Sequence, residues 1–393
     1  MPGAPFFLPV KSPEHLAADF KALYESEPSI FRAPGRVNLI GEHTDYNQGL
    51  VMPAAIDFFT YVAAAPRADR ALRLRSRDFP DEAVLDLEDA PVRPRDHWSD
   101  YAFGVAIKIE EGGRRLKGAD MLVQSEVPIG SGLSSSAALE VAVGLALLEN
   151  AGQSLPPMEL AQTCQRSENE FIGIRSGLMD QFIACFGKAD HAVVLDCRSL
   201  ESTALPLPTD AKLVACNTMV KHQLAASEYN VRRAECEEGV KLLSEELPGI
   251  NSLRDVSISD LLRLSHKLPE KVFARCRHVT TEIARVEEAC VALRHEDLKK
   301  FGRLMYESHA SLRNDYEVSC HELDLMVEFA SQAEGCIGAR MTGGGFGGCT
   351  INLVEAEHVD KFKEVVSTQY AEATGHEPEI YVCSAAEAAS RVA

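Results

Sequence analysis

The chain has 393 residues, of which 46% are hydrophobic and 25% are charged, and this composition is typical of a globular protein with one large or two smaller domains. Its formal net charge of −19 argues against nucleic acid or an anionic membrane as a partner, and no apolar run reaches the length of a transmembrane helix. The 11 cysteines, an odd number without a Cys-x-x-Cys pair, argue against a disulfide framework or a zinc site and indicate a reducing cytoplasm.

The N-terminal third mixes helices and strands around one polar segment. We expect no signal peptide, because the first residues lack a basic region followed by a long apolar stretch. A helix is predicted to begin at Ser12 and Pro13, where a capping residue precedes a proline. Strands are predicted over residues 29–33, 58–65, 71–76 and 83–87, the last pairing with the one before it. A helix over residues 98–111 follows.

The polar segment covers residues 35–49 and is bounded by glycines. Four of its side chains carry ligand chemistry: Arg36, Glu42, His43 and Asp45. Acceptors, donors and a fixed guanidinium fork at this density suit a polyhydroxyl ligand, since a sugar offers a donor and an acceptor at every carbon. A solvated charged loop is the alternative. Apolar residues at positions 37, 39 and 40 indicate a partly buried segment, which favours ligand binding.

Residues 121–148 are predicted to form a strand, a glycine-rich loop and a helix. Residues 121–126 alternate with the period of a strand, and residues 137–148 contain strong helix formers and no proline. The loop between them contains Gly130, Ser131, Gly132, Leu133, Ser134, Ser135 and Ser136. One serine would suffice to cap a helix, so this many serines and two glycines favour a phosphate at the helix start. No Gly-Lys-Ser/Thr follows, so the loop is not the common P-loop.

Two carboxylates follow this loop in the chain. A helix is predicted over residues 157–171 with Glu168 on its apolar face, so Glu168 is either a buried structural acid or a ligand of a hard cation such as Mg²⁺. Asp180 begins a short apolar helix. It either stabilises that helix end or acts as a general base held by arginine. The residues alone leave both pairs of alternatives open.

The second half also mixes strands and helices. The pattern loosens over residues 201–210, so we expect one domain over residues 1–205 and another over residues 206–393. A strand over residues 191–196 is predicted to close the first half, and strands of the second half are predicted over residues 212–216, 335–341, 349–354 and 379–383. Helices are predicted over residues 228–246, 271–294, 297–313, 321–333 and 359–373. This mixture predicts an α+β fold, with the site in the cleft between the halves.

Residues 341–348 (MTGGGFGG) contain the pattern G-x-G-x-x-G. The dinucleotide-binding interpretation requires a helix after the glycines, but the residues that follow have the pattern of a strand. A glycine turn between two strands, with its backbone close to a ligand, fits better than a plain hairpin loop. The residues alone therefore support two hypotheses: a kinase for a small polyhydroxylated substrate, or a sugar- or nucleotide-binding protein without chemistry.

The chain resembles the galactokinases of the GHMP kinase superfamily over nearly its full length. The resemblance rests on residues 35–46 (GRVNLIGEHTDY), on residues 128–137 (PIGSGLSSSA) and on residues 342–348 (TGGGFGG), in that order. It implies an N-terminal domain like the second domain of ribosomal protein S5 and a ferredoxin-like C-terminal domain. It also implies transfer of the γ-phosphate of Mg-ATP to the anomeric hydroxyl of α-D-galactose, which yields galactose 1-phosphate and ADP.

The resemblance also implies the roles of individual residues. Asp180 would take the proton from the anomeric hydroxyl, Arg36 would stabilise the charged partners, and Ser136 and Glu168 would hold Mg²⁺. ATP would lie on residues 130–136. Galactose would be held by Glu42, His43, Thr44, Asp45 and Tyr229, the last in Ser-Glu-Tyr-Asn-Val-Arg-Arg.

Related activities share much of this pattern: kinases for N-acetylgalactosamine, galacturonate or arabinose, and non-catalytic galactose and ATP sensors. The expected protein is a cytoplasmic monomer whose partners are its small-molecule substrates.

Overall fold

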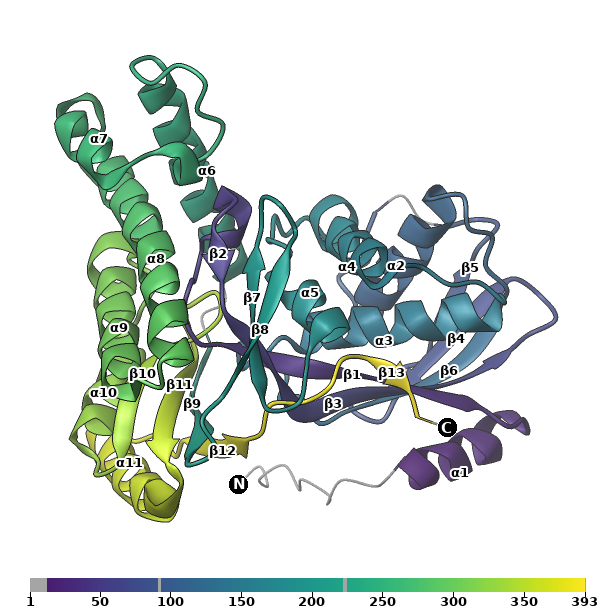
Figure 1. Cartoon of the computed structure of the whole chain (residues 1–393). Coiled ribbons are helices and arrows are strands. Elements are labelled where there is room, and N and C mark those ends of the chain that lie inside the picture. The colour runs from purple at the N-terminus through teal and green to yellow at the C-terminus, as the bar shows by residue number, and fades with distance from the viewer. Residues whose placement is uncertain (1–12, 91–92, 222–224, 393) are drawn as a thin grey trace.

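The computed structural model describes residues 13–90, 93–221 and 225–392, so the predicted cap at Ser12 and the N-terminal segment used to argue against a signal peptide lie outside the described residues. Two halves, each with its own sheet, lie side by side (Figure 1). The mixture of sheets and helices confirms the predicted α+β class.

The N-terminal half is built on a six-stranded sheet with the order β13-β1-β3-β6-β4-β5. Its strands are β1 (Ser29–Asn38), β3 (Pro53–Pro66), β4 (Ala71–Ser76), β5 (Ala83–Asp86), β6 (Ala119–Ser125) and β13 (Ser390–Arg391). Alternate residues of β3 enter different cores, because side chains of a strand point to opposite faces. Val62 packs in the main core, whereas Tyr61 and Ala63 pack with Leu16 and Phe20 of α1 (Pro13–Tyr24).

Most helices of this half cover the sheet face opposite α1 (Figure 1). They are α2 (Asp100–Glu111), α3 (Ser135–Asn150), α4 (Pro157–Arg166) and α5 (Met179–Phe186). A small second sheet joins β2 (Leu50–Val51), β7 (His191–Asp196) and β8 (Ser202–Pro206) in the order β2-β7-β8. Helix α3 is apolar around most of its circumference and is therefore central in the core.

The C-terminal half contains a four-stranded sheet with the order β10-β11-β9-β12. Its strands are β9 (Ala211–Lys221), β10 (Cys336–Met341), β11 (Gly347–Glu355) and β12 (Glu379–Cys383). Its helices are α6 (Ala225–Ser244), α7 (Ile258–Arg263), α8 (Glu270–Arg294), α9 (Leu298–Ser311), α10 (His321–Gln332) and α11 (Val359–Thr374). Helices α6, α7 and α8 extend away from the sheet as one block (Figure 1).

Several features differ from the sequence expectation. Strand β1 was predicted to end at residue 33 but continues to Asn38, so Arg36 lies on the strand. The helix predicted over residues 157–171 is α4 followed by one π-helical turn, Ser167–Ile172. The stretch expected to link the domains, residues 201–210, contains strand β8, which pairs with β7. The chain end returns to the first half, where β13 pairs with β1. The two halves are thus not strictly consecutive in the chain, since the last strand belongs to the first half. The domain division at residue 205 stays a prediction.

Candidate active site

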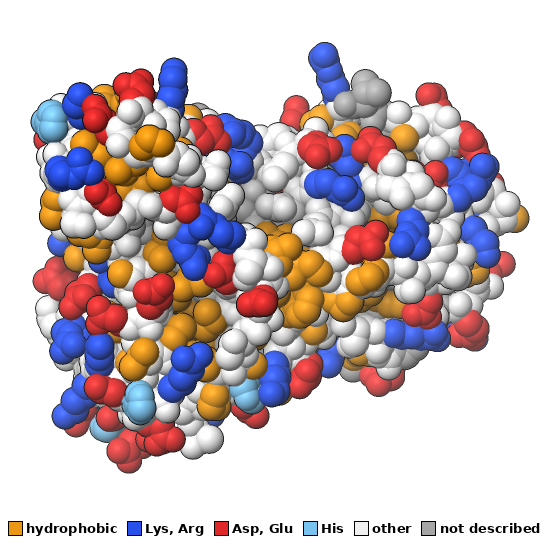
Figure 2. Space-filling model, turned by 45° about the horizontal axis from the view of Figure 1, so that its top comes forward, with side chains coloured by type: hydrophobic (Ala, Val, Ile, Leu, Met, Phe, Trp, Pro, Cys, Tyr) orange, Lys and Arg blue, Asp and Glu red, His pale blue; other side chains and the backbone are white. Residues whose placement is uncertain are grey.

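A polar cavity of about 190 Å³ lies where the two halves meet. Its walls come from the first half through Arg36, Glu42, Asp45 and Asp180 and from the second half through Tyr229 and Gly343–Gly344. The surface is hollowed between the halves, as Figure 2 shows. This position agrees with the expected cleft.

Arg36 of β1 and Asp180 of α5 form an ion pair in the wall of the cavity. Arg36 Nε donates to Asp180 Oδ1 at 2.8 Å, and Nη2 donates to Oδ2 at 2.8 Å, so the pairing is bidentate. The third guanidinium nitrogen, Nη1, donates to the carbonyl of Gly132. Burial opposes the charge on Arg36, but the carboxylates of Asp180 and Glu42 raise the pKa of the guanidinium above its ordinary value. Arg36 is therefore a fixed cation that joins Asp180 to the glycine-rich loop.

The glycine-rich loop lies between β6 and α3, as predicted. Gly130 and Gly132 have φ values of 72° and 81°, in the left-handed region that glycine tolerates best. Ser134 also has positive φ. Its hydroxyl donates to Asp180 Oδ2 at 2.8 Å and accepts no hydrogen bond from the N–H groups at the start of α3. The hydroxyl of the serine that precedes α3 is thus hydrogen-bonded to Asp180 and does not cap the helix. The first N–H groups of the helix stay available for an anion.

The second glycine-rich segment is the turn between β10 and β11, which confirms that a strand follows it. This turn packs on the loop before α3. A Cβ at Gly343 would lie 2.9 Å from the carbonyl oxygen of Gly132, and one at Gly348 would lie 2.8 Å from that of Ser131. Only glycine permits so close a contact between two backbones. Together the two segments line a second cavity, next to the first, which Tyr229 also lines.

Glu168 lies on the π-helical turn after α4, a feature that is frequent at functional sites. Ser176 Oγ donates to Glu168 Oε2 at 2.6 Å, and Ser136 and Gln181 also hydrogen-bond to this carboxylate. Burial raises the pKa of Glu168. No basic side chain among the described residues pairs with it. A buried carboxylate beside a serine hydroxyl at a phosphate-type loop is a set of oxygen donors that suits Mg²⁺.

The loop of residues 41–45 forms another wall of the polar cavity. Glu42 Oε1 accepts from the amide of Gly343 at 2.7 Å, and burial raises the pKa of Glu42 against the opposing effect of Arg340. The ring of His43 lies 5.2 Å from that of Tyr229, and burial lowers the His43 pKa to about 3, so this imidazole is neutral. Burial, and then Asp180, raise the pKa of Asp45 to about 6. The wall therefore combines acceptors, an aromatic face and a neutral imidazole.

Three residues expected to face a ligand turn their side chains elsewhere. Thr44 is fully buried, and its hydroxyl donates to the carbonyls of Gly41 at 2.9 Å and Leu50 at 2.6 Å, because these bonds close the 41–45 loop. Ser131 Oγ donates to the carbonyl of Pro128 at 2.7 Å. Leu133 packs in the main core. Thr44 is a loop-closing residue in this structure, and Ser131 and Leu133 have only backbone atoms to offer a ligand.

Several cavity residues were missed from the sequence, among them Tyr101, Ser176 and Gly177. A Cβ at Gly177 would lie 1.8 Å from Asp45 Oδ2, so this glycine lets the segment before Asp180 pass directly behind Asp45. The one available signal was the short spacing between Ser176 and Asp180. A glycine before a helix is otherwise too common to stand out.

Ser135 and Ser136 also line a largely apolar cavity that Asp180 does not line. Phe79 and Trp98 stack there with ring centroids 5.3 Å apart, and Tyr101 and Ile129 are also part of the lining. Flat aromatic walls beside a phosphate-type loop suit a planar heterocycle.

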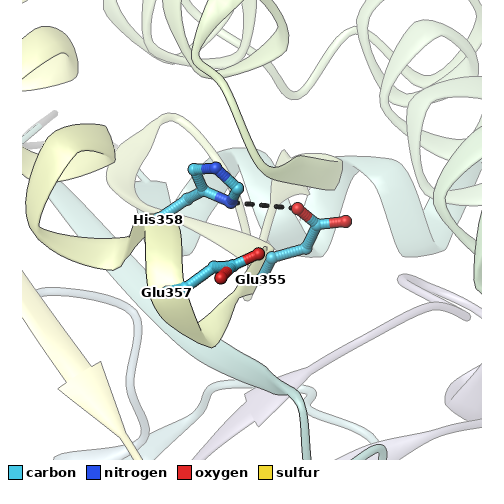
Figure 3. Close-up of side chains that lie close together, drawn as sticks. All are labelled: Glu355, Glu357 and His358. Carbon is cyan, nitrogen blue, oxygen red and sulfur yellow. Dashed lines mark ion pairs between the residues drawn. The ribbon is translucent and has the colours of Figure 1, made fainter.

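A separate group of ligand-type side chains, Glu355, Glu357 and His358, lies before α11 (Figure 3). His358 Nδ1 and Glu355 Oε2 are 3.0 Å apart, and both glutamates are exposed. None of the three residues lines the cavity between the halves.

Within the described ranges, no helix has both the length and the apolar character needed to cross a bilayer.

Comparison with known proteins identifies three family segments. Residues 18–66 match the galactokinase galactose-binding signature, residues 100–188 match the GHMP kinases N terminal domain, and residues 289–372 match the GHMP kinases C terminal domain. The chain is 47% identical to a galactokinase of Roseiflexus sp. (strain RS-1), with 95% of each chain covered. It is 49% identical to a galactokinase of Chloroflexus aurantiacus, with 96% of this chain and 97% of the relative covered.

The solved structures agree. The crystal structure of Lactococcus lactis galactokinase complexed with galactose superposes with a TM-score of 0.92 at 37% identity, over 96% of this chain and 99% of that one. Methanococcus jannaschii mevalonate kinase superposes with a TM-score of 0.66 at 17% identity, over 92% of this chain and 99% of that one, and shares the fold.

Proposed function

The chain belongs to the galactokinase family of GHMP kinases and is an ATP-dependent sugar kinase, and from this premise we propose how its residues transfer the γ-phosphate of Mg-ATP to the anomeric hydroxyl of α-D-galactose. The observation that carries the proposal is the bidentate pair of Arg36 and Asp180, which lies between the 41–45 loop and the loop before α3. The Asp180 carboxylate thus lies between a wall that suits a sugar and a loop that suits phosphate. An acceptor hydroxyl of the sugar would meet the phosphate of ATP at this point.

In this proposal galactose occupies the polar cavity against Glu42, His43, Asp45 and Tyr229. The triphosphate lies on the backbone of residues 130–136 and on the start of α3, where unpartnered N–H groups favour negative charge. The adenine ring lies in the apolar cavity between Trp98 and Ile129. This arrangement places the nucleotide and the sugar on opposite sides of Asp180.

Asp180 accepts the proton of the anomeric hydroxyl as that oxygen bonds to the γ-phosphorus, and the bond from the γ-phosphorus to the bridging oxygen breaks and releases ADP. Arg36 keeps the Asp180 carboxylate in place and neutralises charge that develops beside it. Ser136 and Glu168 would hold Mg²⁺, which when bound supplies charge neutralisation on the phosphate oxygens. Because phosphoryl transfer needs little covalent help from the protein, positioning by these residues accounts for most of the expected rate.

A substrate panel tests this function. Purified protein with Mg-ATP should release ADP with galactose but not with glucose, and N-acetylgalactosamine, galacturonate, arabinose and 2-deoxygalactose define how far the pocket tolerates change. A faster rate with one of these sugars than with galactose would assign the protein to a related substrate.

We also propose a cytoplasmic monomer with domains over residues 1–205 and 206–393. Sedimentation would test the oligomeric state, and expression of the separate halves would test the domain boundary.

Glu168→Gln is expected to raise the Mg²⁺ concentration needed for half-maximal turnover by about 10- to 100-fold, the range typical when support for a metal is lost. Galactose affinity should stay close to wild type. Glu170 lies on the same π-helical turn but is exposed, and it pairs with the buried Lys108, so Glu170→Gln is the matched control. Measurement of turnover against free Mg²⁺ decides the role. Equal Mg²⁺ dependence in Glu168→Gln and wild type would make Glu168 a structural acid.

Asp45→Ala is expected to weaken galactose binding by about 10- to 150-fold, since a hydrogen bond to a charged group is worth about 1.5–3 kcal/mol. Discrimination between galactose and its epimers should narrow, because the lost acceptor no longer penalises a misplaced hydroxyl. Calorimetry with galactose and with ATP checks both statements. ATP affinity serves as the internal control. An unchanged epimer preference would move specificity to another residue.

The pH dependence of the same binding provides a second control. The ionised form of Asp45 accepts hydrogen bonds on both oxygens, and burial raises the pKa of this carboxyl to about 6. Wild-type galactose affinity should therefore fall as the pH drops through about 6, whereas the affinity of Asp45→Asn should not follow that titration.

A further inference from the structure

Buried side chains of the C-terminal half contact the 41–45 loop. Glu282 of α8 accepts from the amide of Gly41 through Oε1 at 2.9 Å. His278, on the same helix, lies with Nε2 at 3.1 Å from the carbonyl oxygen of Glu42. Arg340 of β10 lies with Nη2 at 3.4 Å from Glu42 Oε1. Three contacts on two adjacent residues therefore reach across the boundary between the halves.

Arg340 is the most unusual of these side chains. Its side chain has no exposed surface, and Nη1 donates to the carbonyl of Asn38 at 3.0 Å, just before the loop. Burial lowers the pKa of Arg340, and Glu42 and Glu282 oppose this effect. A fully buried arginine destabilises the fold unless nearby anions compensate its charge. The position of Glu42 is thus tied to the position of a buried cation.

Glu282 completes the network. Its carboxylate is fully buried and accepts from Ser308 Oγ at 2.6 Å and from Arg285 Nε at 2.7 Å, in addition to Gly41. Burial opposes its ionisation, but Arg285, His278 and Arg340 lower its pKa to about 2. Glu282 is therefore a fixed anion with three donors, and one of these donors is the backbone of the 41–45 loop.

We propose that Arg340 and Glu282 are positioning residues that hold the 41–45 loop in the shape that binds the sugar. The inference rests on the proposed function, because it assigns galactose to that loop. Neither residue lines the cavity, so each acts through the loop: Arg340 through Glu42 and Asn38, and Glu282 through the amide of Gly41. Sugar affinity in the N-terminal half is thereby set in part by a helix and a strand of the C-terminal half.

The shape of the loop explains why such support is needed. Gly41 has a φ of 98°, and a Cβ there would lie 2.6 Å from the carbonyl oxygen of Leu50. His43 also has positive φ, at 61°, where a residue other than glycine is strained. A strained backbone persists only when surrounding contacts determine it. The bonds from Glu282, His278 and Arg340 supply such contacts.

The test compares galactose and ADP dissociation constants for Arg340→Lys, Arg340→Met and Glu282→Gln. Lysine keeps the charge and loses the planar fork, so Arg340→Lys should weaken galactose binding by about 10-fold and Arg340→Met by about 100-fold. Glu282→Gln should weaken it by about 10-fold. ADP binding should stay within about threefold in every variant. At saturating galactose, kcat should also stay within about threefold, because Arg36 and Asp180 are untouched.

Arg70→Lys is the matched control. Arg70 donates to the carbonyl of Leu116 at 2.6 Å and to Glu110 at 3.0 Å, so it has the same kinds of partner without contact to the 41–45 loop. Its galactose affinity should stay within twofold of wild type. Should an Arg340 variant fail to fold, Glu282→Gln and Ser308→Ala decide the matter, and Ser308→Ala is expected to weaken galactose binding by about threefold.

Galactose affinity within twofold of wild type in Arg340→Lys and Glu282→Gln would overturn the proposal. An equal loss of galactose and ADP affinity would also overturn it, because that result indicates general loosening of the fold. Failure of the proposed function has a different signature. It would appear in the wild type as an absence of galactose binding, before any variant is compared.

Discussion

Asp180→Asn is expected to lower kcat by about 10²–10⁴-fold, the usual contribution of a general base, while galactose and ATP still bind. Asparagine has nearly the same size but cannot accept the proton of the anomeric hydroxyl. It also offers one oxygen to Arg36, which in the wild type donates to both oxygens of Asp180 at 2.8 Å. Single-turnover phosphoryl transfer, with calorimetric binding of galactose alongside, separates the chemical step from substrate affinity.

Asp196→Asn is a suitable control for that experiment. Asp196 also pairs with an arginine, Arg254, at 2.9 Å, but it lies outside the cavity, so its kcat should stay within about threefold of wild type. A near wild-type rate of transfer in Asp180→Asn would remove Asp180 from the chemistry. Positioning and charge neutralisation would then be the whole mechanism.

Arg36→Ala is expected to reduce kcat by about 10³–10⁵-fold, the effect of an arginine that neutralises charge during phosphoryl transfer. The loss has two causes, because Arg36 both orients Asp180 and donates to the carbonyl of Gly132 in the loop before α3. Arg36→Lys keeps the charge without the fork and should retain a measurable part of the activity. Steady-state kinetics of both variants, with galactose and ATP varied separately, checks the order wild type, lysine, alanine.

Removing Arg36 also leaves Asp180 without its basic partner, so stability has to be measured with the rate. Arg32 lies on the same strand, with its guanidinium carbon 4.3 Å from the centroid of the Phe59 ring, and serves as the control. Arg32→Ala should keep kcat within about threefold of wild type. If Arg36→Lys is as inactive as Arg36→Ala although both remain folded, geometry outweighs charge at this position. Equal kcat values for wild type and Arg36→Ala would contradict the proposed role of Arg36 in phosphoryl transfer.

Much of the fold and the site was predictable because its signals are local. The loop around Gly130 and Gly132 was recognisable, since glycines followed by serines before a helix are typical of an anion site. The turn before β11 was distinguishable from a dinucleotide motif because the residues after it alternate as a strand does. Strand β4 has the predicted bounds, and β5 ends one residue before the predicted residue 87.

Other features depended on contacts between distant parts of the chain. The π-helical turn that carries Glu168 has no distinct sequence pattern, so a regular helix was expected there. Residues 201–210 looked like a linker because they are rich in polar residues and proline, yet strand β8 forms there against β7. Thr44 was expected to contact the sugar, and its hydroxyl bonds to the carbonyls of Gly41 and Leu50 instead, a partner choice set by the folding of the loop.

The sequence by itself determined the family, the class of fold and the residue types available at the site, because these are properties of short segments and of their order. Only the tertiary structure decided which side chains meet. Arg36 and Asp180 are 144 residues apart in the chain, and Gly343 bonds to Glu42 across 301 residues. The physical reason is that backbone preference is set by near neighbours, whereas the direction and partner of a side chain are set by packing between halves that are remote in sequence.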